Sequence, residues 1–310
     1  MSLYRHYSLK LRIMFTNAEK LGLLPAVNFH LWQPCNMRCK FCFATFQDVK
    51  QSCLPKGHLP AQEAAQVVEA LCKAGAGKIT FAGGEPTLCP WLPELLEVAK
   101  RHYVTTMIVT NGTRLEKDWL SQNAHLIDWV ALSVDSLDPL TNELTGRKMP
   151  GSSSPDLVWY LNKVNVIKEA GIRFKANTVV HRWNLQENLA PFISATQPER
   201  WKLFQVLPVK GQNDATVDSL LISDAEFETF LARHNALLPN QVIIPESNHA
   251  MTGSYLMVDP AGRFFDNVNG RHTYSRPILE VGLEKALHEI NFDQRKFYER
   301  EGLYNWVRNR

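Results

Sequence analysis

Several motifs that identify common enzyme classes are absent from this chain. It contains no Gly-x-x-x-x-Gly-Lys-Ser/Thr run, so a phosphate-loop ATPase is not supported. It contains neither Gly-x-Ser-x-Gly nor His-Glu-x-x-His, so the hydrolases that depend on those motifs are not supported either. Long apolar runs are also missing. The longest uncharged stretch, residues 21–37, is broken by Pro25 and Pro34 and does not predict a membrane span.

A strong excess of one charge is missing as well. Lys and Arg total 34 against 31 Asp and Glu, which gives a net charge of +3. We therefore expect no general attraction to nucleic acid or to an anionic membrane, and an anion site must come from local clustering. Hydrophobic residues make up 45% and charged residues 21% of the 310 residues. This composition excludes collagen-like, coiled-coil and disordered chains and predicts a soluble globular protein.

Cysteine is absent from most of the chain, since none follows Cys89. A disulfide framework would spread its cysteines more evenly. The N-terminus also has no short basic segment followed by an apolar core and a small-residue cleavage site, so no secretory signal is recognised. We expect a reducing, cytoplasmic location.

Strand-like and helix-like segments alternate from residue 26 onward, which predicts parallel strands joined by helices. The expected strands are 26–32, 78–82, 105–110, 129–134, 172–180 and 200–207. The expected helices are 60–74, 91–101, 114–123, 155–170, 185–195 and 223–237. The last helix opens with Ser223 and Glu226 at capping-box spacing. We therefore predict an α/β fold, a partial (β/α)6 barrel similar to a TIM barrel.

Three regions follow from this pattern: an N-terminal segment (1–25), the partial barrel (26–240) and a C-terminal extension (241–310). The extension carries strand-like segments at 242–244, 254–258 and 263–265, followed by a helix-like segment at 281–289. We expect this extension to cover the mouth of the barrel.

Three cysteines follow the first predicted strand directly. Cys35, Cys39 and Cys42 have the spacing Cys-x-x-x-Cys-x-x-Cys, at the carboxyl end of a strand, where barrel active sites are built. Three thiolates can hold three irons of a [4Fe–4S] cluster and leave the fourth open to chelate S-adenosylmethionine. Two alternatives remain: a zinc site completed by Cys53 or His58, and a redox pair of Cys39 with Cys42.

The triplet, with Phe41 just before its last cysteine, resembles the radical S-adenosylmethionine superfamily. A second feature agrees, because Gly83-Gly84-Glu85-Pro86 follows the second predicted strand. Two glycines allow close backbone approach to a ligand, and Glu85 offers an acceptor for an ammonium group. The resemblance implies that this segment holds the methionyl amine, although alone it would read as an ordinary turn.

Basic residues occupy one face of the fifth and sixth predicted strands. Lys175 and Asn177 alternate with apolar positions, and so do Arg200 and Lys202. If the apolar face packs on helices, these side chains and Lys78 of the second strand line the lumen. Confined cations are costly without an anion, and a triphosphate would supply the charge. The alternative is that they are solvated at strand ends or paired with carboxylates.

These residues and their surroundings resemble the viperin family over roughly residues 25–305. The matching runs are Cys-Asn-Met-Arg-Cys-Lys-Phe-Cys-Phe from 35, Lys-Ile-Thr-Phe-Ala-Gly-Gly-Glu-Pro from 78, Ser-Val-Asp-Ser from 133, Phe-Lys-Ala-Asn from 174, Arg-Trp-Lys-Leu-Phe-Gln from 200, Glu-Phe-Glu-Thr-Phe-Leu from 226, Pro-Glu-Ser-Asn from 245 and Ser-Tyr-Leu from 254. Viperins convert a nucleoside triphosphate, typically CTP, to its 3′-deoxy-3′,4′-didehydro analogue in antiviral defence. The resemblance implies a [4Fe–4S] cluster, S-adenosylmethionine and an electron donor such as flavodoxin or ferredoxin.

The resemblance also implies a role for particular residues. The cluster ligands would be Cys35, Cys39 and Cys42. The cofactor contacts would be Phe41, Gly83, Gly84, Glu85, Ser133 and Arg147. The triphosphate would be held by Lys78, Lys175, Asn177, Arg200, Lys202 and Arg271, and Tyr255 would be a proton donor near the ribose. Ala82 and His272 stand where vertebrate viperins have serine and lysine, so the phosphate contacts can differ.

Two further interpretations stay open. The chain could be another radical S-adenosylmethionine enzyme that acts on a different anion, or a non-catalytic metal protein whose basic groove binds nucleic acid. Our expectation is a nucleotide substrate, with no nucleic acid and no membrane as partners. The sequence does not decide between CTP, UTP and GTP, because base choice would depend on the backbone around residues 28–33.

Overall fold

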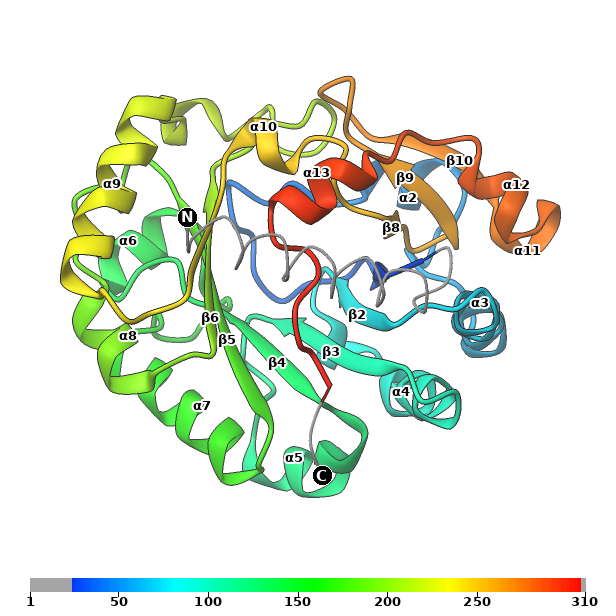
Figure 1. Ribbon diagram of the computed structural model, residues 1–310, viewed down its shortest axis with the longest axis horizontal. Coiled ribbons are helices and arrows are strands. Elements are labelled where there is room, and N and C mark those ends of the chain that lie inside the picture. Colours follow the sequence, from blue (N-terminus) through cyan, green and yellow to red (C-terminus); the bar gives the residue numbers. More distant parts are fainter. Residues whose placement is uncertain (1–23, 308–310) are drawn as a thin grey trace, which may run out of the picture.

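A computed structural model describes residues 24–307, so the segment predicted for residues 1–25 lies almost wholly outside the described residues. Figure 1 shows a strongly curved, open sheet with helices around its outer face. Seven parallel strands form most of it: β1 (Ala26–Trp32), β2 (Lys78–Gly83), β3 (Thr105–Thr110), β4 (Trp129–Ser133), β5 (Arg173–Val180), β6 (Arg200–Gln205) and β7 (Ile243–Glu246). The predicted partial barrel is confirmed.

The C-terminal strands extend the sheet beyond β1. β8 (Met257–Val258) pairs in parallel with β1, and β9 (Arg263–Asp266) and β10 (Thr273–Pro277) follow in antiparallel order. The full order is β10-β9-β8-β1-β2-β3-β4-β5-β6-β7. The C-terminal part of the chain therefore adds strands to both edges of the sheet, since β7 pairs with β6. No strand pairing between β7 and β10 closes the barrel within residues 24–307.

Helices connect the parallel strands and cover their outer face (Figure 1). They are α3 (Ala61–Lys73), α4 (Leu92–Arg101), α5 (Lys117–Asn123), α7 (Leu157–Glu169), α8 (Ala190–Thr196) and α9 (Asp224–Leu237). Shorter helices lie in the loops: α2 (Gln47–Ser52), α6 (Pro139–Leu144), α10 (Asn248–Met251), α11 (Ile278–Val281), α12 (Leu283–Leu287) and α13 (Gln294–Glu299). In the described part of the chain, no helix combines the length and the apolar character of a membrane span.

Two predicted helices differ from the observed ones, each for a local reason. The helix expected from residue 185 begins only at Ala190, because Pro191 lies in its first turn, where a missing N–H is tolerated. The helix expected over 281–289 is observed only over 283–287, as α12, and Gly282, whose φ is 82°, separates it from the preceding α11. The predicted capping box of Ser223 and Glu226 is present at the start of α9.

The last described residues cover the end of the barrel at which its strands begin. The indole N–H of Trp129, the first residue of β4, donates to the carbonyl of Trp306 at 2.8 Å. Arg173, the first residue of β5, donates to the carbonyls of Asn305 and Val307 at 3.1 and 2.9 Å. Figure 1 shows this segment running from α13 across the concave side of the sheet. The extension thus also seals the end opposite the mouth, which the sequence did not predict.

Candidate active site

A cavity of about 650 Å³ lies inside the curve of the sheet, where β1 to β6 end. Eleven of the residues singled out from the sequence line it: Cys35, Cys39, Phe41, Cys42, Gly83, Gly84, Glu85, Ser133, Arg147, Asn177 and Tyr255. The C-terminal extension also reaches this cavity, through Met251, Tyr255, Met257 and Asn267. Segments separated by more than 200 residues therefore form one site.

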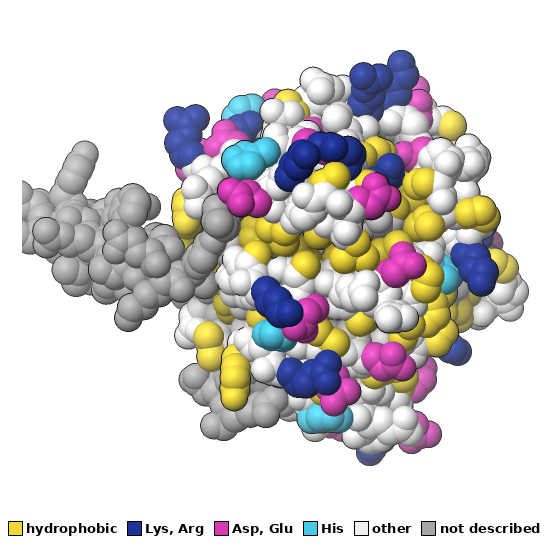
Figure 2. Space-filling view, turned by 90° about the vertical axis from the view of Figure 1, so that its right-hand side faces the viewer, with side chains coloured by type: hydrophobic (Ala, Val, Ile, Leu, Met, Phe, Trp, Pro, Cys, Tyr) yellow, Lys and Arg dark blue, Asp and Glu magenta, His cyan; other side chains and the backbone are white. Residues whose placement is uncertain are grey.

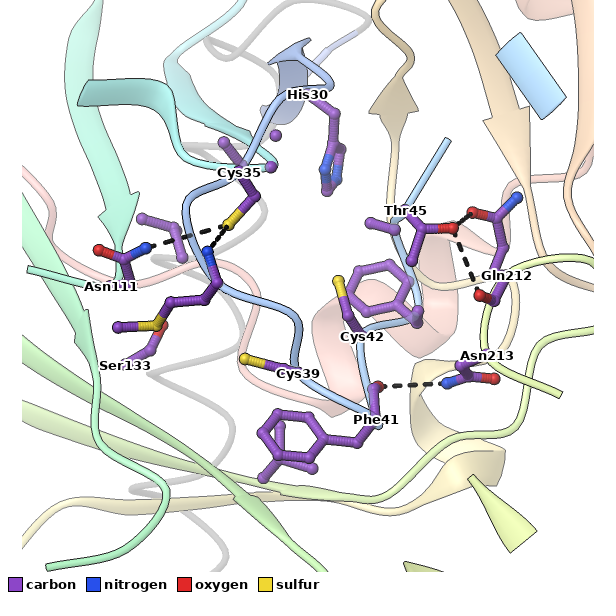
Figure 3. Close-up of a pocket in the computed structure, with 18 of the residues that line it drawn as sticks. His30, Cys35, Cys39, Phe41, Cys42, Thr45, Asn111, Ser133, Gln212 and Asn213 are labelled. Atoms are coloured by element: carbon purple, nitrogen blue, oxygen red, sulfur yellow. Dashed lines mark hydrogen bonds between the residues drawn. The ribbon is translucent and has the colours of Figure 1, made fainter. Parts of the chain in front are cut away.

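The three cysteines lie on a loop between β1 and α2, and Figure 3 shows their sulfurs facing one space. All three are free thiols. The loop is fixed by backbone hydrogen bonds from Arg38 to Gly146 (3.0 Å) and from Lys40 to Thr145 (2.9 Å). In residues 24–307, no group of three His, Cys, Asp or Glu side chains is arranged to hold a single metal ion.

Burial raises the pKa of all three thiols, to about 11 for Cys35 and about 12 for Cys42. The pKa of Cys39 is raised by burial too, although the Arg147 guanidinium opposes the shift. Thiolates in this loop therefore need bound cations to stabilise them. An iron–sulfur cluster supplies that charge, and three sulfurs facing one space are the donor set that it requires.

The two glycines after β2 let its end pack directly on the chain that leads to the cysteines. A Cβ on Gly83 would lie 2.3 Å from the carbonyl oxygen of Trp32. A Cβ on Gly84 would lie 2.2 Å from the carbonyl oxygen of Gln33. Only glycine fits at such distances, so both positions are needed for the close approach of β2 to the cysteine loop.

Glu85 is fully buried, and its carboxylate already accepts several hydrogen bonds. Oε1 accepts from the backbone N–H of Thr87 at 3.0 Å and from the hydroxyl of Thr110 at 2.7 Å. Oε2 accepts from the backbone N–H of Asn111 at 2.8 Å. Burial raises the pKa of Glu85, and these hydrogen bonds oppose that shift. The carboxylate is thus held rigidly in the cavity wall.

Arg147 lies beside Cys39 and is neutralised by Asp135. Its Nε lies 2.8 Å from Oδ2 of Asp135, and both side chains are buried. One guanidinium nitrogen donates to the carbonyl of Ser133 at 2.7 Å, and another lies 3.6 Å from the sulfur of Cys39. Phe41 is held nearby, because its ring stacks on His181. Its carbonyl also accepts a hydrogen bond from Asn213 at 3.2 Å, as Figure 3 shows.

The basic residues predicted for the lumen do face inward, one layer below the cavity. Lys78 and Lys175 precede the cavity-lining Thr80 and Asn177 by two residues on the same strand faces. All four residues, Lys78, Lys175, Arg200 and Lys202, are at most 7% exposed. None of these four lines the cavity itself, whereas Asn177 and Tyr255 do.

Close packing of these cations strongly affects their pKa values. Burial, and then the charge of Lys202, lowers the pKa of Lys78 and Lys175 far below the usual range. Burial lowers the pKa of Lys202 to about 8, although Glu246 opposes the shift. Within the described residues, Lys175 has no hydrogen-bond or ion-pair partner. Positive charge on these buried side chains is therefore unfavourable in the free protein, and a bound anion would stabilise it.

Two further residues that contact these buried basic side chains were not predicted from the sequence. Glu246, which is fully buried, accepts hydrogen bonds from Lys202 and from the hydroxyl of Tyr255. Arg300 donates to Glu246 at 3.3 Å and lies 3.6 Å from the centre of the Tyr255 ring. Glu246 belongs to the matching run Pro-Glu-Ser-Asn from 245. Arg300 directly follows α13, where no periodic sequence pattern indicates the direction of a side chain. We call Lys78, Lys175, Arg200, Lys202 and Arg300 the cation cluster.

Arg271 does not join the cation cluster. It is exposed, and its backbone forms an isolated bridge with Lys210. Arg271 therefore lies on the surface, whereas the other residues expected to hold phosphate lie inside the barrel.

Comparisons with known proteins agree with this geometry. Residues 32–190 match the model of the radical SAM superfamily. An S-adenosylmethionine-dependent nucleotide dehydratase from Flammeovirga pacifica is 53% identical over 285 residues, covering 92% of this chain and 97% of the relative. One from Lacinutrix mariniflava is 51% identical over 296 residues, covering 96% of this chain but 62% of that longer protein. The Danio rerio S-adenosylmethionine-dependent nucleotide dehydratase RSAD2 is 36% identical over 292 residues, covering 91% and 78%.

Solved structures with low sequence identity share the fold. Streptococcus suis SuiB bound to S-adenosylmethionine aligns with a TM-score of 0.65 at 16% identity, covering 89% of this chain and 68% of SuiB. Native anSMEcpe with bound AdoMet aligns with a TM-score of 0.65 at 17% identity, covering 89% and 82%. The chain belongs to the radical SAM superfamily, whose cofactors are a [4Fe–4S] cluster and S-adenosylmethionine, and within it to the family of S-adenosylmethionine-dependent nucleotide dehydratases.

Proposed function

We propose that this enzyme removes water from the ribose of a nucleoside triphosphate and forms the 3′-deoxy-3′,4′-didehydro analogue. CTP is the first candidate, and UTP and GTP are the alternatives. The observation that carries the proposal is the cation cluster, buried beneath a cavity whose wall holds the cysteine triplet. A substrate that spans both layers would have its phosphates on the cations and its sugar toward the cysteines.

The charge of the cation cluster favours a polyphosphate over a smaller anion. Its five cations face two carboxylates, the buried Glu246 and the exposed Glu301, which lies 3.4 Å from Arg200. A triphosphate carries several negative charges, and each charge-assisted hydrogen bond contributes about 1.5–3 kcal/mol. Asn177 adds a neutral partner, since its buried Oδ1 has no hydrogen bond among the described residues.

The residues of this chain would mainly bind and position. When bound, the cluster and S-adenosylmethionine would supply an electron and the radical that removes the ribose 4′ hydrogen. Cys35, Cys39 and Cys42 would hold the cluster. The methionyl group would lie against Phe41, Gly83, Gly84, Glu85, Ser133 and Arg147. Glu85 would accept from its ammonium group.

Loss of the 3′ hydroxyl as water requires a proton, and one further electron completes the product. Tyr255 would deliver this proton. Burial raises the pKa of Tyr255 well above its usual value, so its phenol stays protonated. Its oxygen also accepts a hydrogen bond from Lys202 at 2.9 Å, so Lys202 can return a proton to it.

An electron donor such as flavodoxin or ferredoxin would dock at the mouth of the cavity. The charged residues on the exposed rim are all cations, namely Arg38, Lys40 and Lys50, and none forms an ion pair within residues 24–307. Acidic carriers of this kind fit such a rim. Lys40→Glu should slow product formation with a protein donor and leave the rate with dithionite unchanged.

A role in antiviral defence, in the cytoplasm, completes the proposal. A nucleotide without a 3′ hydroxyl cannot be extended by a polymerase. Expression of the chain in phage-infected bacteria should reduce phage yield, and the Cys39→Ala variant should not. Equal phage yields with both proteins would contradict this role.

The central test uses the anaerobically reconstituted protein with dithionite, S-adenosylmethionine and each triphosphate separately. One triphosphate should stimulate formation of 5′-deoxyadenosine, together with a nucleotide product lighter by one water. A variant with alanine at positions 35, 39 and 42 should give neither product. If no triphosphate stimulates cleavage, the proposed substrate class is wrong, whereas membership of the superfamily stands.

A further inference from the structure

Asn111 directly follows β3, and its side chain reaches from there to the first cysteine of the triplet. It lines the cavity and is buried. Its amide Nδ2 lies 4.0 Å from Sγ of Cys35, as Figure 3 shows. The backbone N–H of Met37 donates to the same sulfur at 3.4 Å. Two uncharged N–H donors therefore converge on Cys35, whereas the side chain that donates to the sulfur of Cys39 is the charged Arg147.

The orientation of the Asn111 amide is fixed by the backbone of Thr113. Its Oδ1 accepts from the backbone N–H of Thr113 at 3.0 Å and from the hydroxyl of the same residue at 2.7 Å. A backbone N–H can only donate, so the amide oxygen must face Thr113 and the NH2 group must face the other way. One N–H of this group donates to Oδ1 of Asn36 at 2.8 Å. Within residues 24–307, the sulfur of Cys35 is the only other acceptor for the group.

Three side chains form a closed ring of hydrogen bonds that includes this amide. Asn111 donates to Asn36, Nδ2 of Asn36 donates to the Thr113 hydroxyl at 2.9 Å, and that hydroxyl donates to Asn111. Because Asn36 directly follows Cys35, the ring connects the end of β3 to the cysteine loop. The backbone N–H of Asn111 also donates to Oε2 of Glu85 at 2.8 Å. The amide therefore cannot turn away from the sulfur without breaking several hydrogen bonds.

We propose that Asn111 is a positioning residue for the iron–sulfur cluster, whose amide donates to the sulfur of Cys35 and thereby raises the reduction potential of the bound cluster. Reduction adds one electron, and the ligand sulfurs carry part of the added negative charge. A hydrogen-bond donor fixed beside such a sulfur stabilises the reduced form more than the oxidised form. The inference goes beyond the proposed function, because it concerns reduction of the cluster and holds for any substrate.

The test uses the anaerobically reconstituted protein without S-adenosylmethionine, so that binding of this cofactor does not contribute. A titration with dithionite, followed by the electron paramagnetic resonance of the reduced cluster, measures the reduction potential. Asn111→Ser keeps a hydroxyl that can accept from the backbone N–H of Thr113 but removes the amide that reaches Cys35. The variant should load the same amount of iron. Its equilibrium constant for reduction should fall about 5- to 10-fold, which makes the potential about 40–60 mV more negative.

Thr113→Val is the matched control, because it opens the same ring and leaves both donors to the Cys35 sulfur in place. Its potential should stay near that of the wild type. An equal shift in both variants would assign the effect to the opened ring and overturn the inference. It is also overturned if Asn111→Ser keeps the wild-type potential, even where its affinity for S-adenosylmethionine changes. Should Asn111→Ser not load iron, Asn111→Thr, which fills more of the space of the amide, decides by the same criterion.

Discussion

The phenolic oxygen of Tyr304 accepts a hydrogen bond from Nζ of Lys78 at 3.1 Å, across 226 residues of sequence. The rings of Tyr304 and Trp306 also lie over the Lys78 ammonium, 4.5 and 4.6 Å from it. The guanidinium of Arg200 lies 4.2 Å from the Tyr304 ring. Aromatic faces attract cations without neutralising them. The C-terminal segment therefore covers the cation cluster and leaves its charge available to a ligand.

Replacing Tyr304 should destabilise the protein. Tyr304→Ala removes the ring contacts with two cations and should lower the free energy of unfolding by about 2–3 kcal/mol. Tyr304→Phe keeps the ring and loses the hydrogen bond, so its cost should be about 1 kcal/mol. Urea denaturation would measure both. Tyr103→Ala, at a position that is 96% exposed, should stay near the wild type, and an equal loss there would show that the effect is not specific.

Lys175→Met should weaken triphosphate binding without unfolding the protein. The substitution removes one charge-assisted partner, which corresponds to about a 10- to 100-fold rise in dissociation constant. Burial and the neighbouring cations favour the neutral form of Lys175 in the free protein, so an apolar side chain at this position should not lower the thermal midpoint. Lys168→Met, at an exposed position on α7, is the control for the change in charge. Unchanged affinity in Lys175→Met would remove the main support for a polyphosphate substrate.

The sequence predicted the sheet well because its signals are periodic and local. The strands expected at 26–32 and 105–110 have the observed bounds. Alternation along β5 and β6 also predicted which side chains face inward, since a buried outer face fixes the orientation of the inner one. The cysteine loop was recognisable because its ligands lie within eight residues of each other.

The remaining parts of the site depend on contacts that no local pattern encodes. Arg300 reaches Glu246 from a loop, 54 residues further along the chain. Arg271 also lies in a loop, where no alternation constrains its side chain, and it turns out to be exposed. His30 lies within the segment 28–33 noted in the sequence, but its two unpaired ring nitrogens become apparent only once its neighbours are known. The positions of these loop residues and the unpaired polar atoms could therefore not be predicted from the sequence.

Triphosphate binding should be accompanied by proton uptake. The pKa of Lys202 is lowered to about 8, and those of Lys78 and Lys175 are also lowered, by burial and mutual repulsion. A bound polyanion raises these pKa values, so neutral lysines gain protons on binding. Affinity should then fall as the pH rises through about 8, above the range in which phosphate itself titrates. Calorimetry in two buffers of different ionisation enthalpy measures the uptake, and proton release would contradict the assignment.

Gly84→Ala should prevent cluster loading, because the added Cβ would collide with backbone and not with a flexible side chain. It would lie 2.2 Å from the carbonyl oxygen of Gln33 and 2.4 Å from that of Pro34, which directly precedes Cys35. Relief of the collision must displace Cys35, so iron content and visible absorption after reconstitution should fall. Gly270→Ala is the control for backbone strain alone, since Gly270 has a φ of +66° and nothing within 4 Å of its Cβ position. That variant should lose about 1–2 kcal/mol of stability and load iron fully. Normal iron content in Gly84→Ala would show that the packing of β2 on the cysteine loop is not required to position the ligands.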